Sequence, residues 1–446
     1  MTATALAAAT PASRDRYLDL LRVASLAVVV LGHWIMAVIE VDARGTVTAT
    51  NLLAALPALQ PVTWLLQVMP VFFFVGGFGH AVALGSSRYD GYTAFVRSRA
   101  TRLLRPTAAF VAVWLLAAVA IDLAGQNTGA LRMAARTVAQ PLWFVGVYLA
   151  VVALAPPMRL LHQRWGLWAT AGLVGAAGLV DVLRLGFGLP AVGSLNLLLV
   201  WLALHQLGFA YADGTLTRGG RRAAALMAAG GLTAVLGLTV FGPYPVSMVG
   251  MPGAKVSNMS PPTVALFVHG VWLIGLVLLL RAPVKRWLDR PRVWTAVIVA
   301  NGLAMTVFLW HLTALFVVAG LAIRFDLLPP VGSLTWWLSR PVWIVALLVV
   351  TALFTLLFRR FDALRAPGGG LAGQGAGVAA AIGMAFGAVG VLGLSVVGLA
   401  GPVSGHTAIL LGVRITALGA VAITLSGFAL LHLPRLPARQ RHGARA

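Results

Sequence analysis

The sequence predicts an all-α polytopic membrane protein, and three observations support this fold class. Hydrophobic residues make up 60% of the 446 residues and charged residues only 10%, whereas soluble globular proteins contain about 25% charged residues. One soluble core cannot bury this much apolar surface, because such cores stop growing at about 250 to 300 residues. The apolar residues also gather in runs of about 20, the length at which a helix crosses about 30 Å of hydrocarbon.

Twelve apolar runs follow one another along the chain, and each predicts one membrane-spanning helix. A helix satisfies its backbone hydrogen bonds internally, as a segment surrounded by hydrocarbon must. The predicted helices are 20–39, 62–84, 106–124, 141–161, 165–183, 192–212, 223–241, 263–280, 293–323, 341–358, 378–399 and 407–431.

The basic residues between the runs predict the orientation. With the loops assigned alternately to two sides, 25 of the 33 basic residues fall on one side. Cytoplasmic loops are the ones enriched in Lys and Arg, so this side is predicted to be cytoplasmic, together with both termini. The net charge of +22 therefore reflects topology in a lipid bilayer, that of the plasma or inner membrane, and no nucleic-acid partner is expected.

A Gly-rich segment, 361–377, predicts a linker, because glycine favours flexible, non-helical backbone. Before it lie a cytoplasmic N-terminus, 1–19, and a ten-helix domain, 20–360. After it lie two additional helices, 378–432, and a basic cytoplasmic tail, 433–446. Residues 1–19 lack the apolar core of a removable signal peptide. The absence of cysteine excludes disulfides and thiolate metal sites, and no metal centre is expected.

Two histidines lie deep in predicted membrane helices, where polar groups are costly. His33 comes thirteen residues after Leu20, which places it about 20 Å along the first helix, in the outer half of the bilayer. His311 reaches a similar depth in the ninth helix. Each is either a packing residue hydrogen-bonded to a neighbouring helix or a general base, and their common depth is consistent with one shared site.

A cluster of arginines precedes the third apolar run. Arg99, Arg102 and Arg105 recur every three residues, so on a helix they form one stripe. The stripe either anchors the helix at the cytoplasmic surface or binds phosphate groups with forked, charge-assisted hydrogen bonds. At the start of the first helix, Asp19 and Arg22 have the spacing of a local ion pair.

Six short blocks occur in order along the first ten predicted helices. They are residues 17–22 (YLDLLR) with 31–33 (LGH), 69–78 (MPVFFFVGGF), 99–106 (RATRLLRP), 141–144 (PLWF), 258–263 (NMSPPT) and 308–311 (FLWH). In this order the blocks resemble the acyltransferase-3 family of integral membrane O-acyltransferases, over residues 14–358. Residues 75–78 (VGGF) depart from the family pattern, in which leucine, serine, glycine and phenylalanine are usual, and Gly76 stands at the serine position.

The resemblance implies a ten-helix acyltransferase core that uses cytoplasmic acyl-coenzyme A as its co-substrate. The acyl group, acetyl or another short chain, is expected to pass to a hydroxyl of a cell-envelope sugar, a glycolipid or a glycosylated metabolite at the outer face. The acceptor, the acyl chain length and the oligomeric state stay open at this point.

The resemblance also implies roles for individual residues. His33 matches the essential first-helix histidine of the family, and Arg22 matches its associated arginine. The family's R-x-x-R motif matches Arg99 with Arg102, although Arg102 with Arg105 has the same spacing. These arginines are expected to bind the phosphates of the coenzyme.

The reaction itself is expected to depend on His33, because the chain has only 11 carboxylates. This histidine is expected either to deprotonate the acceptor hydroxyl or to become transiently acylated. His311 or Trp310 is a candidate hydrogen-bond donor to the developing oxyanion. The long outer segment 242–262 is either a cover for the acceptor or an ordinary loop.

Two other functions compete with this interpretation. A polyprenyl-phosphate-dependent membrane glycosyltransferase requires acidic residues in the first outer loop, where Glu40 and Asp42 lie. A lipid or glycan transporter predicts broken helices in two similar halves, and the sequence shows no such internal symmetry.

Overall fold

A computed structural model of the chain describes residues 7, 9–11, 14–42, 44–87, 89, 91–125, 129–251, 253–362, 376–400 and 406–432. The predicted basic tail, 433–446, and all but the ends of the predicted linker, 361–377, lie outside the described residues.

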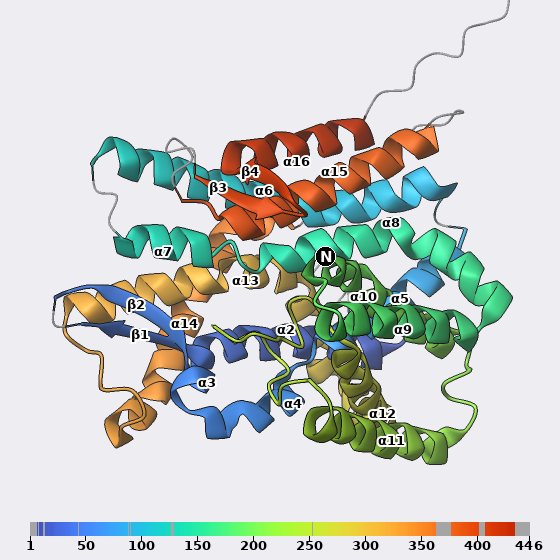
Figure 1. Cartoon of the computed structure of the whole chain (residues 1–446). Helices are drawn as coiled ribbons and strands as arrows, with labels where there is room; N and C mark the ends of the chain where they lie inside the picture. Colours follow the sequence, from blue (N-terminus) through green and yellow to red (C-terminus); the bar gives the residue numbers. More distant parts are fainter. Residues whose placement is uncertain are drawn as a thin grey trace, which may run out of the picture.

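The fold is a bundle of membrane-spanning helices (Figure 1), as predicted. Within the described residues, eleven helical segments are long and apolar enough to cross a membrane. Their principal helices are Arg16–Met36 (α2), Met69–Gly85 (α5), Gly91–Leu123 (α6), Leu142–Trp165 (α8), Leu167–Asp181 (α9), Asn196–Ala212 (α10), Gly220–Phe241 (α11), Val264–Leu288 (α12), Pro291–Arg324 (α13), Leu334–Phe358 (α14) and Ala376–Val397 (α15).

Shorter elements connect these helices. They are the α-helices Leu52–Ala55 (α3), Thr63–Leu66 (α4) and Gly129–Thr137 (α7), the 3-10 helices Pro57–Val62, Pro190–Leu195 and Arg359–Phe361, and a π-helical turn at Val182–Gly186.

The predicted twelfth helix, 407–431, is wrong in its first ten residues. Thr407–Leu410 (β3) and Val413–Thr416 (β4) form an antiparallel hairpin, and the helix that follows, Ala417–Leu431 (α16), has only 15 residues. Leu411 and Gly412 form the turn in left-handed conformations, with φ of 50° and 84°. At 1.5 Å per residue α16 spans about 22 Å, which is less than the hydrocarbon thickness.

The first predicted helix also ends earlier than expected. It stops at Met36 instead of residue 39, and the chain continues as Ala37–Val41 (β1), which pairs antiparallel with Val47–Asn51 (β2). The carboxylate of Asp42 holds the turn by accepting the backbone N–H groups of Arg44 and Thr46, each at 2.8 Å. Both hairpins and α7 lie at one end of the bundle, on the left of Figure 1, which we call the hairpin end.

Glycines bring the central helices close together. A Cβ atom on Gly77 of α5 would lie 1.9 Å from the carbonyl oxygen of His205 in α10, and one on Gly208 would lie 2.2 Å from that of Phe74. Glycine is therefore required at this crossing. In the final pair, a Cβ on Gly427 of α16 would lie 2.6 Å from the backbone of Gly383 in α15.

The final helix pair packs against the ten-helix domain along its length. In Figure 1, α15 runs beside α6 and α8. A Cβ on Gly146 of α8 would lie 3.0 Å from the carbonyl oxygen of Ala388 in α15. The pair is therefore part of the helical bundle.

The described residues of the predicted outer segment, 242–262, are hydrogen-bonded to neighbouring elements. Trp64 donates its indole N–H to the carbonyl oxygen of Val246 at 2.7 Å, and Gln67 donates to that of Met248 at 3.0 Å. The buried side chain of Asn258 donates to the carbonyl oxygens of Pro245 and Ser247. This segment therefore forms a hydrogen-bonded cap over α4 and the start of α5.

Candidate active site

The two histidines singled out in the sequence contact each other in the bundle interior. His33 lies near the end of α2 and His311 in the middle of α13, and Nδ1 of His33 is 2.8 Å from Nε2 of His311. Their rings are nearly parallel, at 11°. Trp34 fixes the two helices at this level by donating its indole N–H to the carbonyl oxygen of His311 at 3.0 Å. We call His33 and His311 the histidine pair.

The hydrogen bonds of the pair determine which ring nitrogens carry protons. Nδ1 of His311 lies 2.6 Å from the carbonyl oxygen of Phe308, which can only accept, so this nitrogen is the donor. In a neutral ring Nε2 of His311 is then an acceptor, and Nδ1 of His33 must donate to it. The remaining nitrogen, Nε2 of His33, therefore carries a lone pair, as a general base or a nucleophile requires.

This arrangement differs from the predicted oxyanion role of His311 and Trp310. Both nitrogens of His311 are engaged, so the ring has no N–H left for an oxyanion. Trp310 is buried and stacks on Phe358, with ring centroids 4.1 Å apart. Neighbouring residues of a helix point about 100° apart, and Trp310 accordingly packs against α14 while His311 contacts α2.

Arg22 lies on the same helix as His33, nearer to its start. It forms the predicted ion pair with Asp19, at 3.2 Å, and Asp19 also accepts from Arg14 at 2.6 Å. The guanidinium of Arg22 lies beside Gly79 of α5, where a Cβ atom would be 3.7 Å from it. Asn301 of α13 donates to the carbonyl oxygen of Asp19, which ties this end of α2 to the helix that carries His311.

Two of the three predicted stripe arginines lie near Arg22. Arg102 of α6 is within electrostatic reach of Arg22 and Arg99, and all three guanidinium groups are within reach of the hydroxyl of Tyr148 in α8. The guanidinium of Arg99 also lies over the rings of Tyr89 and Phe95, 6.0 and 5.8 Å from their centroids. We call Arg22, Arg99 and Arg102 the arginine cluster, and the end of the bundle that carries it the arginine end.

Arg105 does not join this cluster. It lies near His432, the residue after α16, together with Arg97, and Thr101 lies 3.2 Å from the same imidazole. On a helix each residue turns by about 100°, so a three-residue repeat drifts by about 60° each time. The three arginines of the predicted stripe therefore do not share one site, because Arg99 and Arg102 belong to the arginine cluster and Arg105 lies near His432.

Two groups near the arginine cluster, Asp362 and Tyr148, were not assigned to it from the sequence. Asp362 is within electrostatic reach of Arg102 and accepts from the hydroxyl of Thr306 at 2.5 Å. Tyr148 fills the space left by Gly76, where a Cβ atom would lie 3.0 Å from the phenol oxygen. The glycine that departs from the family pattern therefore accommodates Tyr148. Asp362 follows a pair of arginines after α14, and no sequence signal distinguishes it.

A second histidine contact lies between α5 and α10. Nδ1 of His80 is 2.9 Å from Nε2 of His205, and both side chains are buried. His80 is within electrostatic reach of Arg22 and Arg99. Their position beside the arginine cluster is compatible with a structural or a pathway-lining role.

The acidic residues of the first outer loop are in a different environment. Glu40 lies in β1 opposite Thr48. The hydrogen bonds from the backbone N–H groups of Thr46 and Arg44 lower the pKa of Asp42, which makes this carboxylate a weaker base. No group of three potential metal ligands occurs among the residues that the structure describes. The weaker basicity of Asp42 and the place of Glu40 within the hairpin do not favour the glycosyltransferase alternative.

The structure is a largely helical membrane bundle. It has an unprotonated imidazole nitrogen in its interior and a guanidinium cluster at one end, which are the elements of a membrane-bound group-transfer enzyme. Comparison with protein families identifies the group. A family model, the acyltransferase domain of the acyltransferase-3 family, matches residues 15–360. The chain therefore belongs to this family and is a membrane-embedded acyltransferase that transfers groups other than aminoacyl groups. Comparisons with curated proteins and with solved structures give no match.

Proposed function

We propose that the protein transfers a short acyl group, such as acetyl, from cytoplasmic acyl-coenzyme A to a hydroxyl of a cell-envelope sugar, a glycolipid or a glycosylated metabolite. The observation that carries this proposal is the position of the histidine pair and the arginine cluster on shared helices. In the proposed orientation the arginine end faces the cytoplasm, the hairpin end faces outward, and the protein resides in the cell membrane.

The arginine cluster is the proposed site for the phosphates of the coenzyme. Three guanidinium groups from α2 and α6 converge, and arginine binds phosphate through paired, charge-assisted hydrogen bonds. The position of Arg105 beside His432 favours Arg99 with Arg102 as the frame of the R-x-x-R motif. Asp362 and Tyr148 are then close enough to orient the guanidinium groups.

The distance along α2 suits a long, flexible donor. Arg22 and His33 are eleven residues apart, which corresponds to about 16 Å along a helix. The pantetheine arm separates the thioester of an acyl-coenzyme A from its phosphates by a length of this order. With the phosphates at Arg22, Arg99 and Arg102, the thioester lies at the level of the histidine pair.

The proposed chemistry uses the free nitrogen of His33. Nε2 takes the proton of the acceptor hydroxyl while the hydroxyl oxygen attacks the thioester carbon. The carbon–sulfur bond then breaks, and the leaving thiolate receives the proton from His33. His311 stabilises the imidazolium by continuing to accept the hydrogen bond from Nδ1. The same lone pair also permits direct attack of Nε2 on the thioester, with an acyl-imidazole intermediate.

Membranes that contain the protein provide the test. Incubation with radiolabelled acetyl-coenzyme A and envelope extract is expected to label a glycan or glycolipid, and His33→Ala is expected to abolish the label. The competing glycosyltransferase predicts the opposite pattern, in which Glu40→Gln abolishes sugar transfer and His33→Ala retains full acyl transfer.

A further inference from the structure

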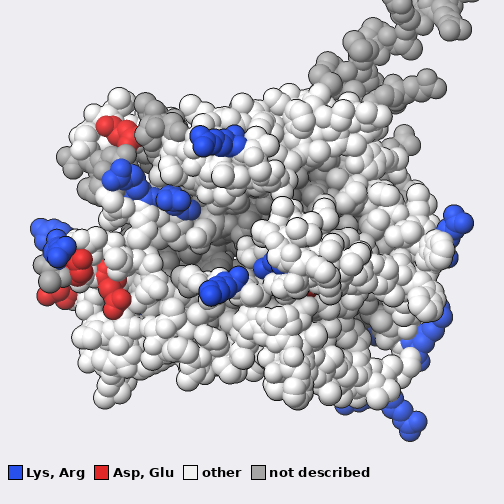
Figure 2. Space-filling model, in the orientation of Figure 1, with Lys and Arg blue, Asp and Glu red and all other residues white. Residues whose placement is uncertain are grey.

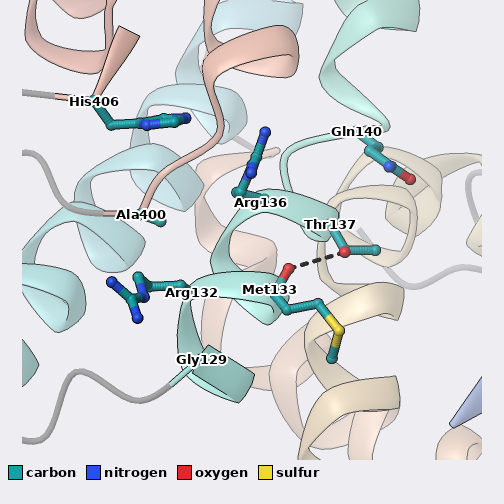
Figure 3. Close-up of a pocket in the computed structure, with 8 residues that line it drawn as sticks. All are labelled: Gly129, Arg132, Met133, Arg136, Thr137, Gln140, Ala400 and His406. Carbon is teal, nitrogen blue, oxygen red and sulfur yellow. Dashed lines mark hydrogen bonds between the residues drawn. The ribbon is translucent and has the colours of Figure 1, made fainter. Parts of the chain in front are cut away.

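A pocket of about 640 Å³ opens at the hairpin end of the bundle. Figure 3 shows its lining, which comes from α7, the turn before α8 and the segments on either side of residues 401–405. This volume is in the range of small-molecule sites. The polar groups are Arg132, Arg136, Thr137, Gln140 and His406.

The final helix pair forms one wall of this pocket through a defined contact. Leu399 donates its backbone N–H to the carbonyl oxygen of Ala135 at 3.0 Å. A Cβ on Gly398 would lie 2.8 Å from Cα of Arg136, and this glycine has a φ of 81°. Only glycine permits so close an approach in this backbone conformation. The wall therefore combines α7, inside the family domain, with residues beyond it.

The pocket carries uncompensated positive charge. Arg132 and Arg136 are four residues apart and lie one turn from each other on α7. Within the part of the chain that the structure describes, no carboxylate forms a salt bridge with either. In Figure 3 the ring of His406 points toward Arg136. Figure 2 shows Lys and Arg side chains around a hollow in this face of the molecule.

We infer that this pocket binds a phosphate group of the acceptor, so that the enzyme acts on a phosphate-bearing glycan or glycolipid. The inference rests on the proposed function in requiring an acceptor at the hairpin end. Two guanidinium groups and an imidazole offer more donors than the two oxygens of one carboxylate can use, whereas a phosphate or diphosphate presents three or more oxygens. The remaining volume accommodates part of a sugar.

The pocket is connected to the histidine pair through packed aromatic rings. Gln140 lines the pocket four residues before Phe144. The ring of Phe144 packs edge-on against that of Phe308, with centroids 5.3 Å apart. The carbonyl oxygen of Phe308 accepts the hydrogen bond from Nδ1 of His311. The pocket therefore lies beside the start of α8, whose Phe144 contacts the segment of α13 that carries His311.

Direct binding tests the inference. The full-length protein in phosphatidylcholine nanodiscs is titrated by calorimetry with inorganic pyrophosphate and, separately, with geranyl diphosphate. The double variant R132Q/R136Q is expected to bind both probes at least about tenfold more weakly, because two charge-assisted contacts are lost. R324Q removes an exposed arginine at the same end but outside the pocket, and it is expected to bind like the wild type. Equal affinity of the wild type and the double variant overturns the inference.

The two probes distinguish the sources of the phosphate. Tighter binding of geranyl diphosphate indicates a lipid-linked acceptor, and equal binding indicates a phosphate that belongs to a glycan. H406Q, on the opposite wall, is expected to weaken both probes and keeps the test valid if R132Q/R136Q fails to fold. Absence of binding of both probes to the wild type contradicts the inference.

Failure of the inference and failure of the proposed function are separable. Binding is measured without acyl-coenzyme A, and H33A is expected to bind both probes like the wild type. If H33A retains full acyl transfer while R132Q/R136Q loses phosphate binding, the proposed function fails, whereas the assignment of the pocket as a phosphate site is supported. If H33A loses acyl transfer while R132Q/R136Q binds normally, only the pocket assignment fails.

Discussion

Nδ1 of His33 lies 2.8 Å from Nε2 of His311, across the interface between α2 and α13. The two residues are 278 positions apart in the sequence. The carbonyl oxygen of Phe308 accepts a hydrogen bond from Nδ1 of His311. Nε2 of His311 must therefore accept from Nδ1 of His33, and the free lone pair lies on Nε2 of His33. Among the residues that the structure describes, this hydrogen-bond chain thus leaves a basic nitrogen on His33 with no carboxylate partner.

Replacement of His311 tests the positioning role. His311→Ala is expected to lower kcat by on the order of 10²-fold, because Nδ1 of His33 loses its acceptor, while KM for acyl-coenzyme A stays unchanged. His311→Gln supplies an amide oxygen as an acceptor and is expected to retain a larger share of kcat. Steady-state kinetics of the two variants measure this difference, and an unchanged kcat in both rules out the role.

The reaction is expected to depend on pH through the histidine pair. As the pH falls, the pair takes up a proton and Nε2 of His33 no longer carries a lone pair, so kcat decreases on the acid side and reaches a plateau on the alkaline side. A profile of kcat between about pH 3 and pH 8 measures this limb. His311→Gln is expected to shift the limb, and a flat profile for the wild type argues against a histidine base.

Binding of coenzyme A tests the arginine cluster. Arg99→Gln and Arg102→Gln are each expected to weaken binding by about 10- to 100-fold, since each removes charge-assisted hydrogen bonds to phosphate. Arg105→Gln is the matched control, because Arg105 lies beside His432 and outside the cluster. Titration calorimetry provides the affinities. A loss of affinity in Arg102→Gln and Arg105→Gln, with Arg99→Gln binding like the wild type, assigns the motif to the other frame.

The crossing of α5 and α10 is expected to tolerate no side chain. Gly77→Ala places a Cβ atom 1.9 Å from a backbone oxygen, so the helices must separate, at a cost of more than about 3 kcal/mol in the free energy of unfolding. Gly237→Ala on α11 is the control, because no atom lies within 4 Å of the added carbon. Thermal unfolding of the two purified variants compares them, and equal midpoints refute the packing argument.

Hydropathy predicted the helices of the fold and missed its two hairpins. Runs of about 20 apolar residues have few alternatives in a membrane, and eleven of the twelve predicted helices are found among the described residues. Residues 407–416 are equally apolar, but they alternate β-branched side chains around a Leu-Gly turn and carry Arg414. Such a segment favours a hairpin over a helix, and the mean hydropathy of a long window does not distinguish the two.

The depth of the site residues in the membrane could be predicted from the sequence, whereas the residues that they contact could not. Counting residues placed His33 and His311 at similar depths, and the structure brings them into contact. Which helices lie side by side depends on lateral packing, for example at Gly77 and Gly208, and hydropathy carries no information about it. Helical rotation likewise separates Arg105 from Arg102, although their spacing equals that of Arg99 and Arg102.

Chemical rescue of His33→Ala tests most directly whether His33 is the reacting group. The rate of acyl transfer from labelled acetyl-coenzyme A to envelope acceptors is measured with the purified variant, without and with added imidazole. If His33 is the reacting group, the rate without imidazole is expected to be about 10²- to 10⁴-fold below that of the wild type. Added imidazole is expected to restore part of the lost activity, and the variant is expected to bind coenzyme A. A variant that transfers acyl groups at the wild-type rate contradicts the assignment of His33 as the reacting group.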